Sequence, residues 1–153
     1  FSISVWAWAD PTQIPETTIN DIIRKWDADT YGYPFAICFS NNNAPAEIAR
    51  SYMTVRYDGS ICRNSPYASS PEVTLSTFHH IVMTKSGSVI NMYVDNTLLA
   101  SYTDNTSCGT TNNADMTFGS RGNIVSFFTG KIDDIRIYNR TIRNSEIGGL
   151  FNE

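Results

Sequence analysis

The sequence predicts an all-β protein, a single antiparallel β-sandwich of the jelly-roll type. Apolar and polar residues alternate along short segments, and turn signals separate these segments about every 8 to 12 residues, as in sandwich proteins. The composition agrees, because aromatic residues reach 12% and charged residues only 17%, a mixture that favours strands. A chain of 153 residues has the length of one domain and can bury a core without crosslinks.

The first strand is expected at 1–8, where the sequence FSISVWAW places Phe, Ile, Val and Ala on one face and Ser and Trp on the other. A loop that contains two prolines follows at 10–20. Further strands are expected at 21–27, 31–40, 48–59, 77–87, 89–102, 114–120 and 127–139.

Turn residues divide these strands. An Asn-rich cluster occupies 41–47, and the dipeptides Asp58-Gly59 and Asp95-Asn96 are typical of tight hairpin turns. The stretch 60–72 follows no regular pattern. Only 143–151 reads as helical, one short C-terminal turn that Ser145 could cap.

Charge and hydropathy argue against two classes of protein. The net charge is −4 and no run of Lys or Arg is present, which argues against a nucleic-acid surface. No segment approaches the roughly 18 apolar residues of a membrane span. Abundant Asn, Ser and Thr with little Lys suit a secreted or cell-surface protein. The chain starts within a strand, so we expect a domain excised from a longer protein or a mature fragment.

Three cysteines allow one disulfide at most. Cys38 lies in an apolar strand and is expected to be a buried small side chain. Cys62 and Cys108 lie in polar, turn-rich segments and could form a bridge. No spacing of Cys and His matches a zinc site.

Four segments together resemble the laminin-G-like domains of the concanavalin A-like lectin and glucanase jelly-roll family. They are FSISVWAW at the start, the stretch from TFHHIV to YVDNTLLAS, MTFGS, and the final GKIDDIRIYNRTIRNSEIGGLF. The residues that match the family pattern are Trp6, Phe78, His79, His80, Tyr93, Val94, Asp95, Gly130, Ile132, Asp133, Asp134, Arg136, Tyr138, Asn139 and Glu146. The resemblance covers nearly the whole chain and implies a concanavalin A-like sandwich.

The sequence departs from the family pattern at three places. Phe78 stands where the family usually has Trp, and Asn96 stands where it usually has Gly. The family also has a strand and a Gly/Asn-rich turn before FSISVWAW, and both are absent here. Because that stretch helps to build a calcium site in some relatives, the resemblance implies Ca²⁺ only weakly. The missing strand predicts an exposed sheet edge, unless another part of the parent protein or a second copy covers it.

Asp133 and Asp134 are adjacent carboxylates that could be catalytic, metal-binding or structural. Neighbours in a strand point to opposite faces, so these two cannot flank one glycosidic bond, which requires both carboxyl groups to open on one cleft. No E-x-D-x-x-E pattern is present either. We expect Asp134 to pair with Arg136, two positions along the same face, and Asp133 to bond backbone amides or to contribute with Asp134 to a cation site.

His79 and His80 invite a catalytic interpretation. They lie in one strand and therefore face opposite sides. No Ser or Cys occupies a nucleophile-elbow context, and no third group is identifiable. A structural role is predicted for both histidines.

Sugar rings present apolar C–H faces that stack on exposed aromatic rings, while their hydroxyls bond to Arg, Asn and Asp. We therefore predict that the carbohydrate-binding residues are Trp8, Trp26, Tyr31, Arg50, Tyr52 and Arg56. Trp6 is expected to pack in the core instead. Arg50, Tyr52 and Arg56 share one face of the 48–59 segment, and this face is either the floor of a glycan groove or simply solvated.

The leading functional prediction is a non-catalytic carbohydrate-binding or adhesion module that recognises a polysaccharide or glycan. The first alternative is a protein-interaction or spacer domain of an extracellular multidomain protein, in contact with the other domains. The second is a glycan hydrolase or lyase. The predicted metal site is Asp133 with Asp134, and Ca²⁺ is the cofactor that it could hold. This function rests on the resemblance, because a fold alone does not fix a function.

Overall fold

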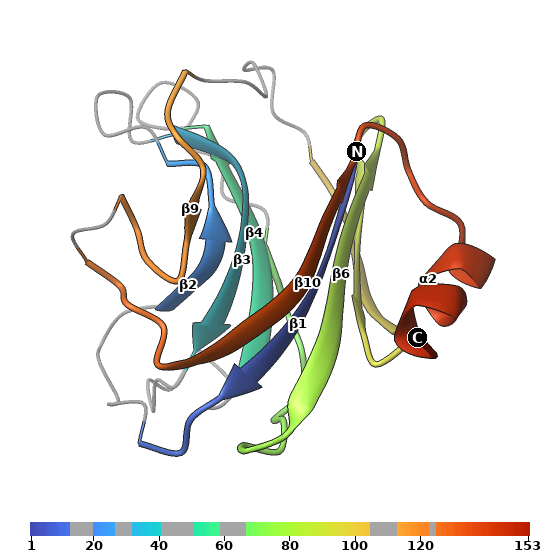
Figure 1. Ribbon diagram of the computed structural model, residues 1–153. Coiled ribbons are helices and arrows are strands. Elements are labelled where there is room, and N and C mark those ends of the chain that lie inside the picture. The colour runs from blue at the N-terminus through green and yellow to red at the C-terminus, as the bar shows by residue number, and fades with distance from the viewer. Residues whose placement is uncertain (13–19, 27–31, 41–50, 59–66, 105–112, 123–124) are drawn as a thin grey trace.

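The computed structural model describes residues 1–12, 20–26, 32–40, 51–58, 67–104, 113–122 and 125–153. These residues form two antiparallel sheets of five strands each, with one helix on the outside (Figure 1). The predicted β-sandwich with one short C-terminal helix is confirmed.

Sheet A holds its strands in the order β10-β1-β6-β7-β8. Their bounds are Gly130–Tyr138, Ser2–Ala9, Phe78–Ser86, Val89–Val94 and Thr97–Thr103. Sheet B has the order β5-β4-β3-β2-β9. Its strands are Tyr67–Ser69, Ser51–Asp58, Gly32–Ser40, Asn20–Arg24 and Thr117–Phe118. Each expected strand is present, most of them shortened by a few residues, whereas β5 lies in the stretch for which no strand was expected.

The core fills the space between the two sheets. Ile3 of β1 and Ile81 of β6 are fully buried there on the inner face of sheet A. Phe39 of β3 and Tyr52 of β4 meet them from sheet B, with their ring centroids 5.4 Å apart. The apolar face of the first segment, FSISVWAW, is therefore the inner face, as its alternation predicted.

Helix α2 (Asn144–Phe151) covers the outer face of sheet A (Figure 1). Ile147 and Leu150 are buried in one cluster with Val82 and Tyr93 of that face. The helix thus shields part of the outer face of sheet A from solvent, although this face also carries polar residues.

The start of α2 differs from the prediction. Ser145 lies within the helix and does not cap it, because Arg143 occupies the N-cap position. The Glu146 carboxylate accepts a hydrogen bond from the Arg143 backbone N–H at 2.9 Å, and it also pairs with the Arg140 guanidinium. A carboxylate near the helix N-terminus is favoured by the unpaired N–H groups there.

The expected hairpin turn at Asp95-Asn96 joins β7 to β8. Both residues have positive φ, 49° for Asp95 and 61° for Asn96. This is the backbone of a type I′ turn, whose twist matches that of the flanking strands. Asn and Asp tolerate this conformation better than other residues that carry a side chain.

β10 contains a bulge in its middle. Ser4 pairs with Arg136 and Trp6 pairs with Asp133, so two residues of β10 lie opposite Val5 alone. Asp134 is one of the two and has a φ of 46°. The simple alternation expected for Asp133 and Asp134 therefore does not apply at this point of the strand.

The two sheets leave open edges. In the described part of the chain, β10 has a strand neighbour only on its β1 side, and β9 only on its β2 side. Within the same residues, no helix is long and apolar enough to cross a membrane.

Candidate carbohydrate-binding site

A pair of aromatic rings lies on the outer face of sheet A. The register of the strands places Trp8 of β1 between Lys131 of β10 and Phe78 of β6. Directly paired side chains of this kind share a face and lie about 5 Å apart. Phe78 is 38% exposed, Trp8 is half-buried, and the Lys131 ammonium lies 4.8 Å from the centroid of the Trp8 ring.

The next row of the same face consists of Asp133, Trp6 and His80. Helix α2 covers Trp6 and His80 but leaves Asp133 exposed. Phe151 stacks on Trp6 with ring centroids 5.8 Å apart, and Trp6 stacks on His80 at 5.0 Å. The helix therefore partly covers Trp6 on the outer face of sheet A, so Trp6 is packed, but it does not lie in the core between the sheets, where it was expected. Exposed groups remain beside it. We call these groups the Trp8 platform: Trp8, Phe78, Lys131 and Asp133.

The Trp8 platform carries the chemical groups that saccharides need. Ring faces offer an apolar surface for sugar C–H groups, and the ammonium and carboxylate can bond to hydroxyls. The attraction between Lys131 and the Trp8 ring amounts to only about 0.5–1 kcal/mol at an exposed site. Lys131 can therefore move off the ring when another group stacks on it.

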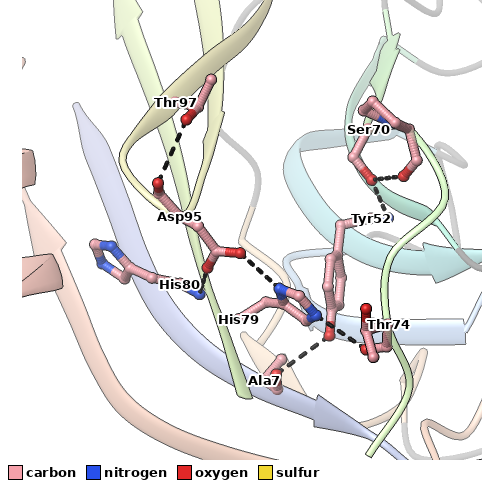
Figure 2. A network of polar contacts seen from close by, with 9 residues as sticks. Ala7, Tyr52, Ser70, Thr74, His79, His80, Asp95 and Thr97 are labelled. Atoms are coloured by element: carbon pink, nitrogen blue, oxygen red, sulfur yellow. Dashed lines mark hydrogen bonds and ion pairs between the residues drawn. The ribbon is translucent and has the colours of Figure 1, made fainter. Parts of the chain in front are cut away.

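On the inner side of sheet A, a network of polar contacts joins β6 to the β7–β8 turn and to the loop before β6 (Figure 2). His79 points into the sandwich, where its Nδ1 lies 2.7 Å from Oδ2 of Asp95 and its Nε2 lies 2.9 Å from the carbonyl oxygen of Thr74. The other oxygen of Asp95 accepts a hydrogen bond from the His80 backbone N–H at 2.9 Å. Thr74 belongs to the loop at 70–77, and this loop also lines a shallow pocket with residues 72–75.

The partners of His79 favour its charged form. Both ring nitrogens face oxygen acceptors, and only an imidazolium can donate from both. The hydrogen bond to Asp95 raises the pKa of His79. Burial opposes ionisation of Asp95, but the hydrogen bonds from His79 and the His80 backbone outweigh burial and lower the pKa of Asp95. The contacts thus favour an ion pair between His79 and Asp95, and through His79 they link the β7–β8 turn to the 70–77 loop.

His80 has the opposite environment. Its side chain is fully buried on the outer face, and burial lowers the pKa of His80. Ser4 Oγ lies 2.7 Å from His80 Nε2, the distance between a nucleophile and its base. Yet Ser4 is only 1% exposed beneath α2, and His80 Nδ1 has no hydrogen-bond partner among the described residues. The hydrogen bond therefore links β1 to β6 beneath the helix, where a substrate cannot reach Ser4.

The structure separates the predicted carbohydrate-binding residues. Trp8 lies at the end of β1, whereas the half-buried Trp26 follows β2, which runs toward the opposite end of the sandwich (Figure 1). Tyr31 and Arg50 lie outside the described residues. Arg56 belongs to β4, but its side chain is also outside the described part.

The prediction for Tyr52 is wrong. Its ring is fully buried between the sheets, and its hydroxyl donates to the carbonyl oxygen of Ala7 at 3.2 Å (Figure 2). The next residue on the same face, Thr54, is fully buried too. At Tyr52 and Thr54 this face of β4 is therefore part of the interior and neither a glycan groove nor a solvated surface.

Asp133 and Asp134 take the structural contacts that were expected. Asp134 accepts two hydrogen bonds from the Arg136 guanidinium, both at 2.9 Å. Asp133 Oδ1 accepts a hydrogen bond from the Asp134 backbone N–H at 2.8 Å. No group of three or more His, Cys, Asp or Glu side chains that could hold a metal ion occurs among the described residues. Both oxygens of Asp134 are thus engaged by Arg136, and binding of Ca²⁺ by Asp133 and Asp134 stays a prediction.

Phe78 and Lys131 were not predicted as site residues. Each lies in a different strand from Trp8, and only the register of sheet A brings them together. The signal in the sequence was the parity of Trp8 within FSISVWAW, which placed it on the face opposite the core. Parity alone does not identify its neighbours across the sheet.

Comparison with known proteins agrees with this architecture. The family model of the concanavalin A-like lectin/glucanases superfamily matches residues 1–148. No curated protein matches the sequence. The receptor-binding domain of botulinum neurotoxin D is similar in structure, with a TM-score of 0.76 and 14% identity over 99% of this chain and 36% of that one.

Two similar structures carry bound sugars. Domain 4 of a GH43 extracellular arabinanase from Geobacillus stearothermophilus, in complex with arabinotriose, has a TM-score of 0.66 and 17% identity over 97% of this chain and 65% of that one. The botulinum neurotoxin D ligand-binding domain in complex with N-acetylneuraminic acid has a TM-score of 0.72 and 14% identity, over 99% and 35%. This chain spans about a third of the length of the neurotoxin domains. At these identities the likeness concerns the fold, and with the family match it gives one conclusion: the chain belongs to the concanavalin A-like lectin/glucanase superfamily.

Proposed function

We propose that this domain is a non-catalytic carbohydrate-binding module and that the Trp8 platform holds the glycan. The observation that carries the proposal is the side-by-side placement of Trp8 and Phe78 on the outer face of a sheet, flanked by Lys131 and Asp133. Two structurally similar domains have bound sugars, arabinotriose in one and N-acetylneuraminic acid in the other. Both belong to larger proteins, and a secreted or cell-surface location fits this role.

A glycan would bind to an almost preformed surface. The strands fix the backbone of Trp8 and Phe78, so stacking requires little ordering of the protein beyond the movement of Lys131. The same face contains no pair of carboxylates arranged for glycoside hydrolysis among the described residues, because Asp134 is held by Arg136. The proposal is therefore recognition without bond cleavage.

The test is a binding screen of the intact domain against a panel of glycans, with arabinotriose and N-acetylneuraminic acid among the first probes. Trp8→Ala and Phe78→Ala should each weaken binding at least tenfold, which corresponds to about 1.4 kcal/mol. Trp26→Ala is the matched control, since Trp26 is also half-buried but follows β2, a strand of the other sheet. Binding that depends on Trp26 and not on Trp8 would refute the platform as the site.

The screen should be run with calcium and with a chelator. Equal binding in both arms is the expected result, because the described residues assemble no calcium ligand set. Loss of binding with chelator would show a cation site that Asp133 and Asp134 do not complete by themselves. Release of reducing sugar during the incubation would contradict the non-catalytic proposal.

A further inference from the structure

Among the described residues, most charged side chains around the Trp8 platform are carboxylates. Lys131 and Asp133 lie two positions apart on β10, so both side chains belong to the outer face of sheet A. Asp10 is the second residue after Trp8. Hydrogen bonds from Thr12 lower the pKa of Asp10, and the nearby charge of Lys131 lowers it further. The cation of the platform is therefore accompanied by both carboxylates.

The charges farther along this face follow the same pattern. The Arg136 guanidinium of β10 pairs with the carboxylates of both Asp134 and Glu153. Burial has the largest effect on the pKa of His80, and the charges of these three residues act on it as well. His80 lies in the row beside the platform. In the described part of the chain, carboxylates therefore outnumber cations around the platform.

A sugar ring that stacks on Trp8 takes the place of the Lys131 ammonium, which lies 4.8 Å from the centroid of that ring. The displaced ammonium stays near Asp10 and Asp133, so a sugar carboxylate would compete with both of them for it. Asp133 is exposed, and its Oδ1 accepts a hydrogen bond from the Asp134 backbone N–H. A carboxylate has further lone pairs. Asp133 can therefore accept a hydrogen bond from a sugar hydroxyl, whereas it repels a sugar carboxylate.

We propose that the Trp8 platform selects uncharged saccharides and that Asp133 disfavours acidic ones. The inference rests on the proposed function and names the class of its ligand. An uncharged sugar gains the ring surface of Trp8 and Phe78 and a hydrogen bond to Asp133. An acidic sugar brings a further negative charge to a face that already carries an excess of them. Lys131 does not reverse this preference, because its charge already acts on Asp10.

The first test measures the charge around Trp8 without any sugar. Iodide and caesium ions quench the fluorescence of accessible tryptophans, and subtraction of the same protein with Trp8→Phe isolates the signal of Trp8. Asp133→Asn removes a charge about 7–8 Å from Trp8, its diagonal neighbour on the adjacent strand. Iodide quenching of Trp8 should then rise about 1.5-fold and caesium quenching should fall, because this distance is within a Debye length.

Two controls accompany the quenching measurement. Acrylamide is uncharged and should quench Trp8 equally in Asp133→Asn and the wild type, which shows that the accessibility of the ring is unchanged. Asp115→Asn is the matched variant, because Asp115 is also exposed but lies before β9 of the other sheet. It should leave the quenching of Trp8 by both ions unaltered. Equal iodide quenching in Asp133→Asn and the wild type would overturn the role assigned to Asp133.

The second test compares N-acetylneuraminic acid with its methyl ester, which carries no charge. In calorimetry at low salt, the ester should bind to the wild type about threefold more tightly than the acid. Asp133→Asn should reduce this preference, and Trp8→Ala should weaken both complexes. Where neither form binds, the quenching result decides the inference.

The inference and the proposed function fail in different ways. Tighter binding of the acid, lost both in Trp8→Ala and in Lys131→Met, would overturn the inference and support the proposed function. A folded domain that binds no glycan of the screen would overturn the proposed function, and the inference with it.

Discussion

At the scale of single residues, the main feature is that two adjacent histidines have opposite charge preferences. His79 points inward to Asp95 and Thr74, where hydrogen bonds favour the imidazolium. His80 points outward beneath α2, where burial favours the neutral ring. The sheet lies between them, so one peptide bond separates two different titrating environments.

His79 should stabilise the protein below about pH 6.5 and lose this contribution as the pH rises above that value, because its pKa is raised in the folded state. Its pKa is raised in the folded state, so the contribution is complete below the unfolded value of about 6.5 and is lost as the pH rises through the folded value. We expect His79→Gln to lower the free energy of unfolding by about 1–2 kcal/mol at pH 6, a charged hydrogen bond discounted for the partial exposure of Asp95. Urea unfolding of both proteins from pH 5 to 9 measures this, and an equal difference at all pH values would contradict it.

His80 should act in the opposite direction. Its pKa is lowered in the folded state, so its contribution is present above about 6.5 and declines as the pH falls through the folded value. We expect His80→Phe, made together with Ser4→Ala so that no hydroxyl is left without its partner, to reduce the loss of stability between pH 6.5 and 4.5. Thermal unfolding in that range is the measurement. An unchanged acid slope would mean that other groups produce it.

The Trp8 prediction and the Tyr52 error have the same physical origin. Alternation placed Trp8 opposite the core correctly, because the other face of β1 is purely apolar. In β4, Met53 and Val55 are buried on one face, and Tyr52 and Thr54 are buried on the other. When both faces of a strand are buried, alternation does not show which face is exposed to solvent. A face with polar residues is then wrongly predicted to be the exposed one.

At the scale of elements, helix α2 determines which part of sheet A is accessible. It buries Ile147 completely and stacks Phe151 on Trp6. The helix has only eight residues, which is too short to be stable alone. Its stability therefore comes from the surface it covers.

Ile147→Ala should cost about 2–4 kcal/mol, the loss of a buried side chain plus the cavity that remains. The same variant should loosen α2 and change the fluorescence of Trp6 before the sheets unfold. Chemical unfolding followed by both circular dichroism and fluorescence checks this. Ile142→Val, at a buried position just before the helix, is a mild control with an expected cost of about 0.5–1.5 kcal/mol. Coincident transitions in Ile147→Ala would show that α2 does not detach first.

The strands themselves were largely predictable, since alternation and turn dipeptides act locally. The hairpin at Asp95-Asn96 was predicted because few residues besides Gly, Asn and Asp accept positive φ. The bulge at Asp134 was not, because it arises from a mismatch between β1 and β10 that neither strand shows alone. β5 was missed because three residues are too few for a periodic pattern.

At the scale of the whole molecule, the packing of sheet A against sheet B through Phe128 depends on a glycine. Gly130 starts β10, and a Cβ there would lie 2.1 Å from the Trp8 carbonyl oxygen and 2.7 Å from the Phe128 ring. Phe128 in turn packs edge-on against Phe39 of sheet B, with centroids 6.1 Å apart. The close approach of β1, β10 and Phe128 therefore requires the absence of a side chain.

Gly130→Ala should destabilise the domain by about 1–3 kcal/mol or more through overpacking, and it should shift the Trp8 platform together with β1. Gly149→Ala is the control, because a Cβ at that helical position meets no atom within 4 Å and should stabilise the protein by up to about 1 kcal/mol. Melting temperatures of the two variants against the wild type decide the matter. Equal stability of Gly130→Ala and the wild type would show that β1 and Phe128 can move apart to accommodate a methyl group.

The fold class could be predicted from the sequence because it needs only the number of strands, their length and their alternation. The site could be predicted only in part, because it depends on pairing between distant strands. Trp8 meets Phe78 and Lys131 only once sheet A has formed.

The two adjacent histidines can also serve as spectroscopic probes of the structure. His79 and His80 follow each other in the chain but report on different sides of one sheet. Their ring proton signals in a nuclear magnetic resonance titration would therefore act as two independent probes, one for the interior with its 70–77 loop and one for the space beneath α2. A ligand could then be located on the outer face or in the interior by which of the two signals moves.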